Sequence, residues 1–142
     1  MNPEAFGSTY EREAQFSLNF VSERLKPTKD KFVLGAFDCN NQLVGIVTFM
    51  RENNSPIGNV YGMYISPEER RKGVGKLLMI ELINKAKNCE GLKRINLKVV
   101  SNNYSAIKLY QSLGFEVYGV EINAINYKGQ FFDEDLMVFK ID

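Results

Sequence analysis

The alternation of apolar and polar positions along the chain predicts a domain that mixes strands with helices. Short β-rich runs bounded by turn residues are typical of strands, and longer runs with apolar residues three or four apart are typical of helices. Strands are predicted at residues 31–37, 43–50, 60–65, 94–100, 115–127 and 130–141. Helices are predicted at residues 103–114 and over a run with Val74, Leu77, Leu78, Leu82 and Ala86 on one side, which Glu90-Gly91 stops.

The first thirty residues carry helix signals instead. Ser8 and Glu11 have the spacing of a capping box, in which the two side chains satisfy backbone amides at a helix start. Ser17 is in position to cap a further turn with apolar residues on one side, which Pro27 ends. We therefore expect short helices ahead of the first strand.

The order of these elements predicts the sheet. The strand–helix–strand unit across residues 60–100 requires a parallel, right-handed crossover, whereas the hairpins before and after it are antiparallel. A mixed sheet with helices on both faces is the simplest architecture that buries both of its sides. The fold class is therefore α/β (α+β), and residues 1–142 are expected to form a single domain.

Composition narrows the class of protein. With 142 residues, 44% of them hydrophobic and 25% charged, the chain has the make-up of a globular domain with a substantial core. A net charge of +1 argues against a dedicated nucleic-acid binder. No apolar run is long enough to span a bilayer, and residues 1–13 are polar and carry acids, unlike a signal peptide. These features predict no membrane and no nucleic-acid partner.

The chain contains no histidine, which removes the most common general base and the usual zinc ligand. Its two cysteines, Cys39 and Cys89, have neither metal-ligand spacing nor a disulfide pattern. A reducing, cytoplasmic setting and no bound metal are therefore expected. Any catalysis must use carboxylates, tyrosine, lysine, backbone amides or water.

The segment "SPEERRKGVGK", residues 66–76, begins like a helix and is then interrupted by two glycines. Ser66 and Glu69 have capping-box spacing, and Pro67 fits the first helical position. A continuous helix would carry Gly73 and Gly75 in its interior, at about 1 kcal/mol each relative to alanine. The alternative is one short turn, a tight loop through the glycines and a new helix.

We favour the second arrangement because it gives the glycines a role. The first amides of a helix lack intrahelical acceptors, and together with the helix dipole they attract an anion. Arg70, Arg71, Lys72 and Lys76 add positive charge around this point. The pattern is neither a P-loop nor a dinucleotide fingerprint, and on its own an ordinary basic turn explains it equally well.

A second group of residues lies on the predicted helix at 103–114. Asn103 and Tyr110 are seven residues apart, which at ~100° per residue returns both to one face of a helix. Asn103 also fits an N-cap, and Tyr110 also fits a half-buried core position. The shared face would suit a common functional site, but each residue also has a purely structural interpretation, as a cap or as a core residue.

Together these motifs resemble those of the GNAT superfamily of N-acetyltransferases. The central family motif, R/Q-x-x-G-x-G/A after a strand, stands here as Arg70 to Gly75. The second signature, N-x-x-A-x-x-L-Y-x-x-x-G-F, stands in register at Asn103, Ala106, Leu109, Tyr110, Gly114 and Phe115. The ending "FFDEDLMVF" also resembles a "DE-x-x-M" pattern of one branch of the family. The resemblance covers roughly residues 31–141.

The resemblance implies acetyl-CoA as the cosubstrate, bound along a splayed central strand whose backbone pairs with the pantetheine arm. The amides of the glycine loop are implied to hold the pyrophosphate. The implied cofactor-binding residues are Met63, Tyr64, Ile65, Arg70, Arg71, Lys72, Gly73, Val74, Gly75, Lys76, Asn103 and Tyr110.

The implied reaction is direct transfer of the acetyl group to an amine, without a covalent enzyme intermediate. A backbone N–H near Met63 would stabilise the oxyanion, and Tyr110 would be the general acid. The base is left open between Glu134, Asp133, Tyr61 and water, with Glu134 as first choice. Tyr61, Asp133 and Glu134 are the candidate substrate-binding residues, and their acids would favour a cationic amine. The alternative is that the acids form only a solvated strand end.

One departure concerns the start of the chain. Family members begin with an edge strand, and no such strand is predicted in this sequence, so we expect it to be either missing or supplied by a partner, as in a homodimer. A non-catalytic module that binds coenzyme A or a nucleotide remains the alternative function, and an RNA-binding domain has little support. The acceptor, a small-molecule or peptide amine, cannot be read from the sequence.

Overall fold

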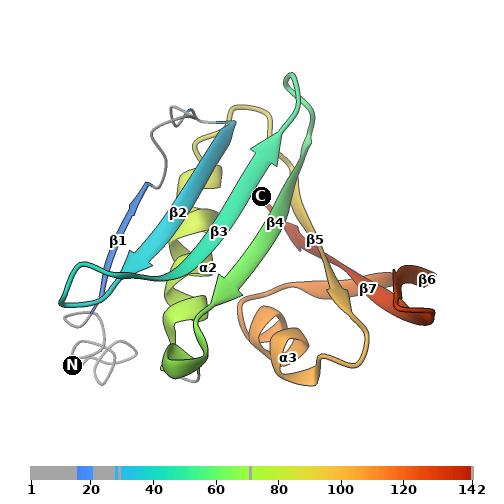
Figure 1. The fold of residues 1–142 in the computed structure, drawn as a ribbon. Coiled ribbons are helices and arrows are strands. Elements are labelled where there is room, and N and C mark those ends of the chain that lie inside the picture. Colours follow the sequence, from blue (N-terminus) through green and yellow to red (C-terminus); the bar gives the residue numbers. More distant parts are fainter. Residues whose placement is uncertain (1–15, 21–27, 29, 71, 142) are drawn as a thin grey trace.

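A seven-stranded sheet forms the frame of the protein in a computed structural model that describes residues 16–20, 28, 30–70 and 72–141. Its strands lie in the order β1-β2-β3-β4-β5-β7-β6 (Figure 1). The strands are β1 (Ser17–Phe20), β2 (Lys31–Phe37), β3 (Leu43–Arg51), β4 (Ile57–Ile65), β5 (Arg94–Val100), β6 (Glu116–Tyr127) and β7 (Gln130–Lys140). The helices are the single 3₁₀ turn η1 (Pro67–Glu69), α2 (Val74–Ala86) and α3 (Tyr104–Ser112).

This arrangement confirms the predicted α/β class with a mixed, mostly antiparallel sheet. Among the described residues, α2 and α3 pack in one core on the same face of the sheet, so the expectation of helices on both faces is not confirmed. Only β4 and β5 pair in parallel, and every other neighbouring pair in the described sheet is antiparallel. Strand β4 begins at Ile57, ahead of the predicted start at residue 60, and α2 ends at Ala86, before the predicted stop at Glu90-Gly91. No helix in the described ranges is long and apolar enough to cross a membrane.

The start of the chain differs from the prediction. Residues 17–20 form strand β1, which pairs antiparallel with β2, and not the predicted helical turn. A short helix gains few internal hydrogen bonds, whereas the edge of β2 offers a row of free backbone groups, and Phe20 packs against Phe32 with ring centroids 6.1 Å apart. The expectation of an absent N-terminal edge strand is therefore wrong. Ser8, Glu11 and Pro27 lie outside the described residues.

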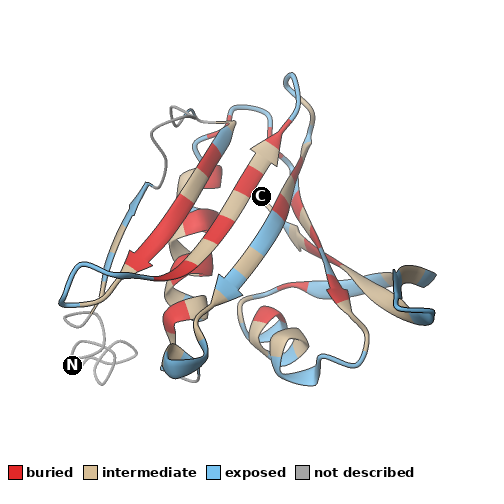
Figure 2. Cartoon of the chain, viewed as in Figure 1, coloured by how far each residue is buried: buried red, intermediate tan, exposed pale blue. Residues whose placement is uncertain are grey.

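The core lies between α2 and strands β2, β3 and β4. The largest fully buried side chains include Leu78, Met79 and Leu82 of α2 and Leu34, Val47 and Phe49 of the strands. Figure 1 shows α2 running behind these strands, and Figure 2 shows their buried positions in red. Strand β4 packs on this core through the buried Val60.

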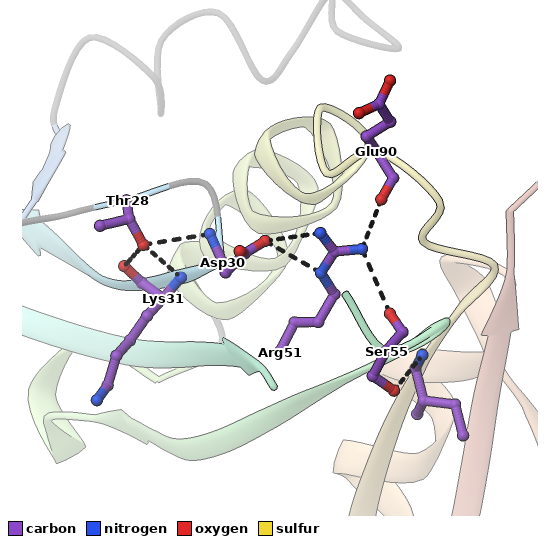
Figure 3. Close-up of polar contacts among 7 residues, drawn as sticks. Thr28, Asp30, Lys31, Arg51, Ser55 and Glu90 are labelled. Atoms are coloured by element: carbon purple, nitrogen blue, oxygen red, sulfur yellow. Dashed lines mark hydrogen bonds and ion pairs between the residues drawn. The ribbon is translucent and has the colours of Figure 1, made fainter. Parts of the chain in front are cut away.

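A buried arginine closes the end of the sheet where β4 and β5 pair. Arg51 donates through Nε to Asp30 Oδ1 at 3.0 Å, and through Nη1 to the carbonyl oxygens of Glu90 at 2.7 Å and Ser55 at 3.3 Å (Figure 3). These contacts join the start of β2, the β3–β4 loop and the α2–β5 loop. The charge is buried and is compensated by the ion pair with Asp30 and by these hydrogen bonds, as buried charges must be.

Candidate active site

Strands β4 and β5 are paired over only three residues and then diverge. Ile57, Gly58 and Asn59 pair with Arg94, Ile95 and Asn96, after which residues 60–65 pair only with β3 and residues 97–100 only with β7. Figure 1 shows the two strands spreading apart toward the end where α2 and α3 begin. Among the described residues, none pairs with the second edge of residues 60–65. This edge is therefore open to an extended ligand that pairs as a strand would.

A β-bulge lies in this open part of β4. Tyr61 pairs with Thr48 and Tyr64 with Ile46, so Gly62 and Met63 together oppose a single residue of β3. Gly62 has φ +60°, the left-handed conformation that a glycine adopts freely. A bulge redirects the backbone amides beside it. The bulge was not predicted from the sequence, although a glycine inside a strand pattern is the signal that marks such sites.

The glycine-interrupted segment forms a turn, a loop and then a new helix, as predicted. Residues Pro67–Glu69 form the 3₁₀ turn, and Gly73 adopts φ +85° immediately before α2 starts at Val74. The amides of Val74, Gly75 and Lys76 precede the first α-helical hydrogen bond, which Leu77 donates to Gly73. These amides point out of the helix start and are available to an anion.

Two details of the prediction for this segment are wrong. The capping box does not form, because Ser66 makes no side-chain capping bond and its hydroxyl is buried without a partner among the described residues. Gly75 lies within the first turn of α2 and not in the loop. A Cβ there would meet Leu109 of α3 at 3.4 Å, an ordinary van der Waals distance, so α2 and α3 lie next to each other at this point.

The cations around this helix start differ in their contacts and exposure. Arg70 donates through Nε to the carbonyl oxygen of Ile65 at 3.2 Å and so secures the end of β4. Lys72 lies 3.4 Å from Glu69, and Lys76 is exposed on the first turn of α2. Arg71 lies outside the described residues.

Asn103 and Tyr110 stand at opposite ends of α3. Asn103 Oδ1 accepts from the amide of Ala106 at 3.3 Å, which confirms the predicted N-cap. Tyr110 is buried, with 6% of its surface exposed, and packs edge-on against Phe115 with ring centroids 5.9 Å apart. Burial raises the pKa of its hydroxyl above 10.0. The Tyr110 ring is therefore a core group, while its hydroxyl has no hydrogen bond to any described residue.

The three acids of β7 are half-buried, and two of them accept hydrogen bonds from described residues. Asp133 Oδ1 accepts from the amide of Asn123 at 2.9 Å, and Asp135 Oδ1 accepts from Ser101 Oγ at 2.6 Å. Glu134 has no hydrogen bond to a described residue. It pairs with Val100, next to the buried Val99, so strand alternation places it on the face away from α3.

The structure thus brings together the open edge of β4, the start of α2 and α3 with Tyr110. Glu134 lies across β5 from β4, on the opposite face of the sheet from Tyr110. The exposed Tyr61 lies on β4 and is separated from the β7 acids by β5.

Comparisons with known proteins agree with this geometry. A model described as the acetyltransferase (GNAT) family matches residues 2–115. A mycothiol acetyltransferase from Thermomonospora curvata is 27% identical over 122 residues, which make up 86% of this chain and 40% of that protein. Another, from Thermobispora bispora, is 36% identical over 69 residues, 49% of this chain and 23% of that protein. The chain thus spans less than half the length of these curated relatives.

Among solved structures, an acetyltransferase of the GNAT family from Streptococcus pneumoniae has a TM-score of 0.74 and 30% identity, over 80% of this chain and 69% of that chain. The family match covers most of the residues, including the glycine loop and α3. This chain therefore belongs to the acetyltransferase (GNAT) family.

Proposed function

We propose that the protein is an N-acetyltransferase that moves the acetyl group of acetyl-CoA directly to an amine, without a covalent enzyme intermediate. The observation that carries the proposal is the divergence of β4 and β5 beside the Gly62 bulge. At the same end lie a helix start with free amides and the helix α3, which carries a buried phenol without a hydrogen bond to described residues. Membership of the acetyltransferase family supports the same reaction class.

The residues present fit coenzyme A in two ways. Its pantetheine arm carries amides that match an open strand edge, here the backbone of Met63, Tyr64 and Ile65. Its pyrophosphate matches the amides of Val74, Gly75 and Lys76, with the lysine side chain as a further positive charge. When bound, acetyl-CoA supplies an activated acetyl thioester.

The roles of the protein groups follow from where they lie. The amide of Met63, redirected by the bulge, would donate to the acetyl oxygen as negative charge develops there. Tyr110 would donate its phenolic proton to the departing sulfur, and its raised pKa keeps that proton in place at neutral pH. Direct transfer is favoured because neither Cys39 nor Cys89 lies on β4, α2 or α3, the elements of the site.

The amine would approach from the face opposite α3, where Glu134 is the favoured base. Asp133 is less suited because its carboxylate already holds the Asn123 amide. Glu121 lies directly across from Glu134, so two carboxylates face this side, of which one is paired with Lys98 at 3.4 Å. This charge favours an acceptor, small molecule or peptide, that carries a positive group in addition to its reacting amine.

The test is acetyl-CoA turnover over a panel of amines that carry an additional cationic, neutral or acidic group. Tyr110→Phe is expected to lower kcat by about 10²–10⁴-fold while coenzyme A binding is retained. Tyr104→Phe is the matched control, because Tyr104 begins the same helix but is 71% exposed.

Three results would contradict the enzyme activity, the role of Tyr110 and the cationic preference, respectively. Binding of acetyl-CoA without turnover of any amine would favour the non-catalytic binding module. A fully active Tyr110→Phe variant would exclude Tyr110 as the acid. Faster turnover of neutral or acidic acceptors would remove the cationic preference.

A further inference from the structure

We propose that Ser101 and Asp135 form a positioning pair that sets the location of the Tyr110 phenol. The inference rests on the proposed role of Tyr110 as the general acid. It assigns Asp135 to helix placement and not to the amine site, where the other acids of β7 were expected to act.

The turn before α3 is tied to β7 by both backbone and side chain. The amide of Ser101 donates to the carbonyl oxygen of Asp133 at 2.9 Å, and the Ser101 hydroxyl donates to Asp135 Oδ1 at 2.6 Å. The second bond is short and charge-assisted, the stronger class of hydrogen bond, and it is partly buried. The turn that leads into the helix therefore has a fixed position relative to the sheet.

This turn passes its position directly to α3. The Asn103 amide donates to the carbonyl oxygen of Val100 at 2.9 Å, and the Asn103 side chain caps the helix at Ala106. Only one residue separates Ser101 from Asn103. A shift of the Ser101 turn therefore moves the cap, and with it the helix that carries Tyr110.

The other end of α3 is held by the same face of β7. Phe115 donates its amide to the carbonyl oxygen of Tyr110 at 3.0 Å and packs against both the Tyr110 ring and Phe139, at 5.4 Å from the latter. Asp135 and Phe139 are four residues apart on one strand, so their side chains share a face. Strand β7 thus fixes α3 at both ends, by a hydrogen bond at one and by aromatic packing at the other.

The first measurement is the ring signal of Tyr110 in NMR spectra of tyrosine-labelled protein, identified by its loss in Tyr110→Phe. Ser101→Ala and Asp135→Ala are expected to shift this signal, and Ser101→Thr, which keeps the hydroxyl, to restore it. Ser112→Ala is the control: it removes an equally short hydroxyl bond, to the carbonyl oxygen of Leu109 at 2.6 Å, from the same helix but not from the sheet. An unmoved signal in both Ser101→Ala and Asp135→Ala overturns the inference.

The second measurement separates positioning from general stability. Both variants are expected to lower kcat about 10- to 100-fold with little change in the KM for acetyl-CoA, as for a misplaced catalytic group. In a Tyr110→Phe background the same substitutions should cause almost no further loss, because they act through the removed hydroxyl. Full additivity in that background contradicts the inference. If Tyr110→Phe is fully active while the Tyr110 ring signal is shifted in Ser101→Ala and Asp135→Ala, the result contradicts the proposed acid instead.

Discussion

The Tyr110 hydroxyl lies in a setting that keeps it protonated. Burial disfavours the phenolate and raises the pKa above 10.0, so the proton is retained over the neutral range but is harder to release. The same shift makes Tyr110 a poor proton donor to a free thiolate, because the reference pKa of a thiol is only about 8.5. In the proposed reaction, proximity of the Tyr110 hydroxyl to the departing sulfur has to supply the difference.

A pH prediction follows for this residue. Because the folded pKa lies above that of the unfolded chain, Tyr110 loses no proton below about pH 10, and its contribution to stability is lost only as the pH rises beyond that value. We expect kcat, measured from about pH 6 to pH 10, to show no alkaline decline that depends on Tyr110. A decline centred below about pH 9 that vanishes in Tyr110→Phe would contradict this.

Arg51 provides a stability prediction. Arg51→Met keeps most of the apolar volume but leaves the Glu90 and Ser55 carbonyl oxygens without their donor. We expect the free energy of unfolding to fall by about 2–3 kcal/mol, measured by urea denaturation.

The same substitution at the exposed Arg94 is the control, with an expected change within about 0.5 kcal/mol. Equal losses at the two sites would show that the contacts of Arg51 add nothing to stability.

At the scale of elements, the bulge of β4 can be tested by a pair of glycines. Gly62 and Gly129 both have positive φ, and a Cβ at either would meet no atom within 4 Å. Alanine at either position should therefore cost about 1–2 kcal/mol through backbone strain alone. Only Gly62→Ala is expected to lower kcat as well, since only that glycine precedes the Met63 amide.

Stability from denaturation and turnover from steady-state kinetics check this pair. An equal loss of kcat in Gly62→Ala and Gly129→Ala would show that the bulge has no specific part in the reaction.

The elements predicted well from the sequence are those in which the spacing of apolar residues shows which face is buried. The apolar spacing from Val74 to Ala86 marked α2, and the alternation at residues 94–100 marked β5, because each buries one face of its own residues. Asn103 was predicted as a cap because a cap is a local contact.

The features that were missed depend on groups far away in the chain. Residues 17–20 are strand because β2 offers an edge, and Gly62 is bulged because of its register with β3. The predicted capping box is absent, since the Ser66 hydroxyl is buried and makes no hydrogen bond to the amide it was expected to cap. The engagement of Asp133 and Asp135 likewise follows from contacts with β6 and the α3 turn, which spacing does not reveal.

At the scale of the whole molecule, ligand binding should be visible as stability. Because coenzyme A would contact β4 and α2, elements that exist only in the folded chain, acetyl-CoA at about 100 times its Kd should stabilise the fold by about 2.7 kcal/mol. A thermal shift titration measures this. Pantetheine, which lacks the pyrophosphate, is the control for the anion site and should give a smaller shift at equal concentration. The absence of any shift with acetyl-CoA would count against the proposed cosubstrate.

Because only three residue pairs join β4 to β5, the sheet consists of two parts with a short connection. The first part contains β1 to β4 and packs on α2, and the second contains β5, β7 and β6, with α3 packed on the face of β7. The angle between these two parts determines how far Tyr110 lies from β4 and, in the proposed reaction, how far Glu134 lies from the acetyl group. Substitutions that alter this angle, even in residues remote from the site, would therefore change which amines the family fold accepts, so acceptor choice can diverge between relatives whose cofactor residues are the same.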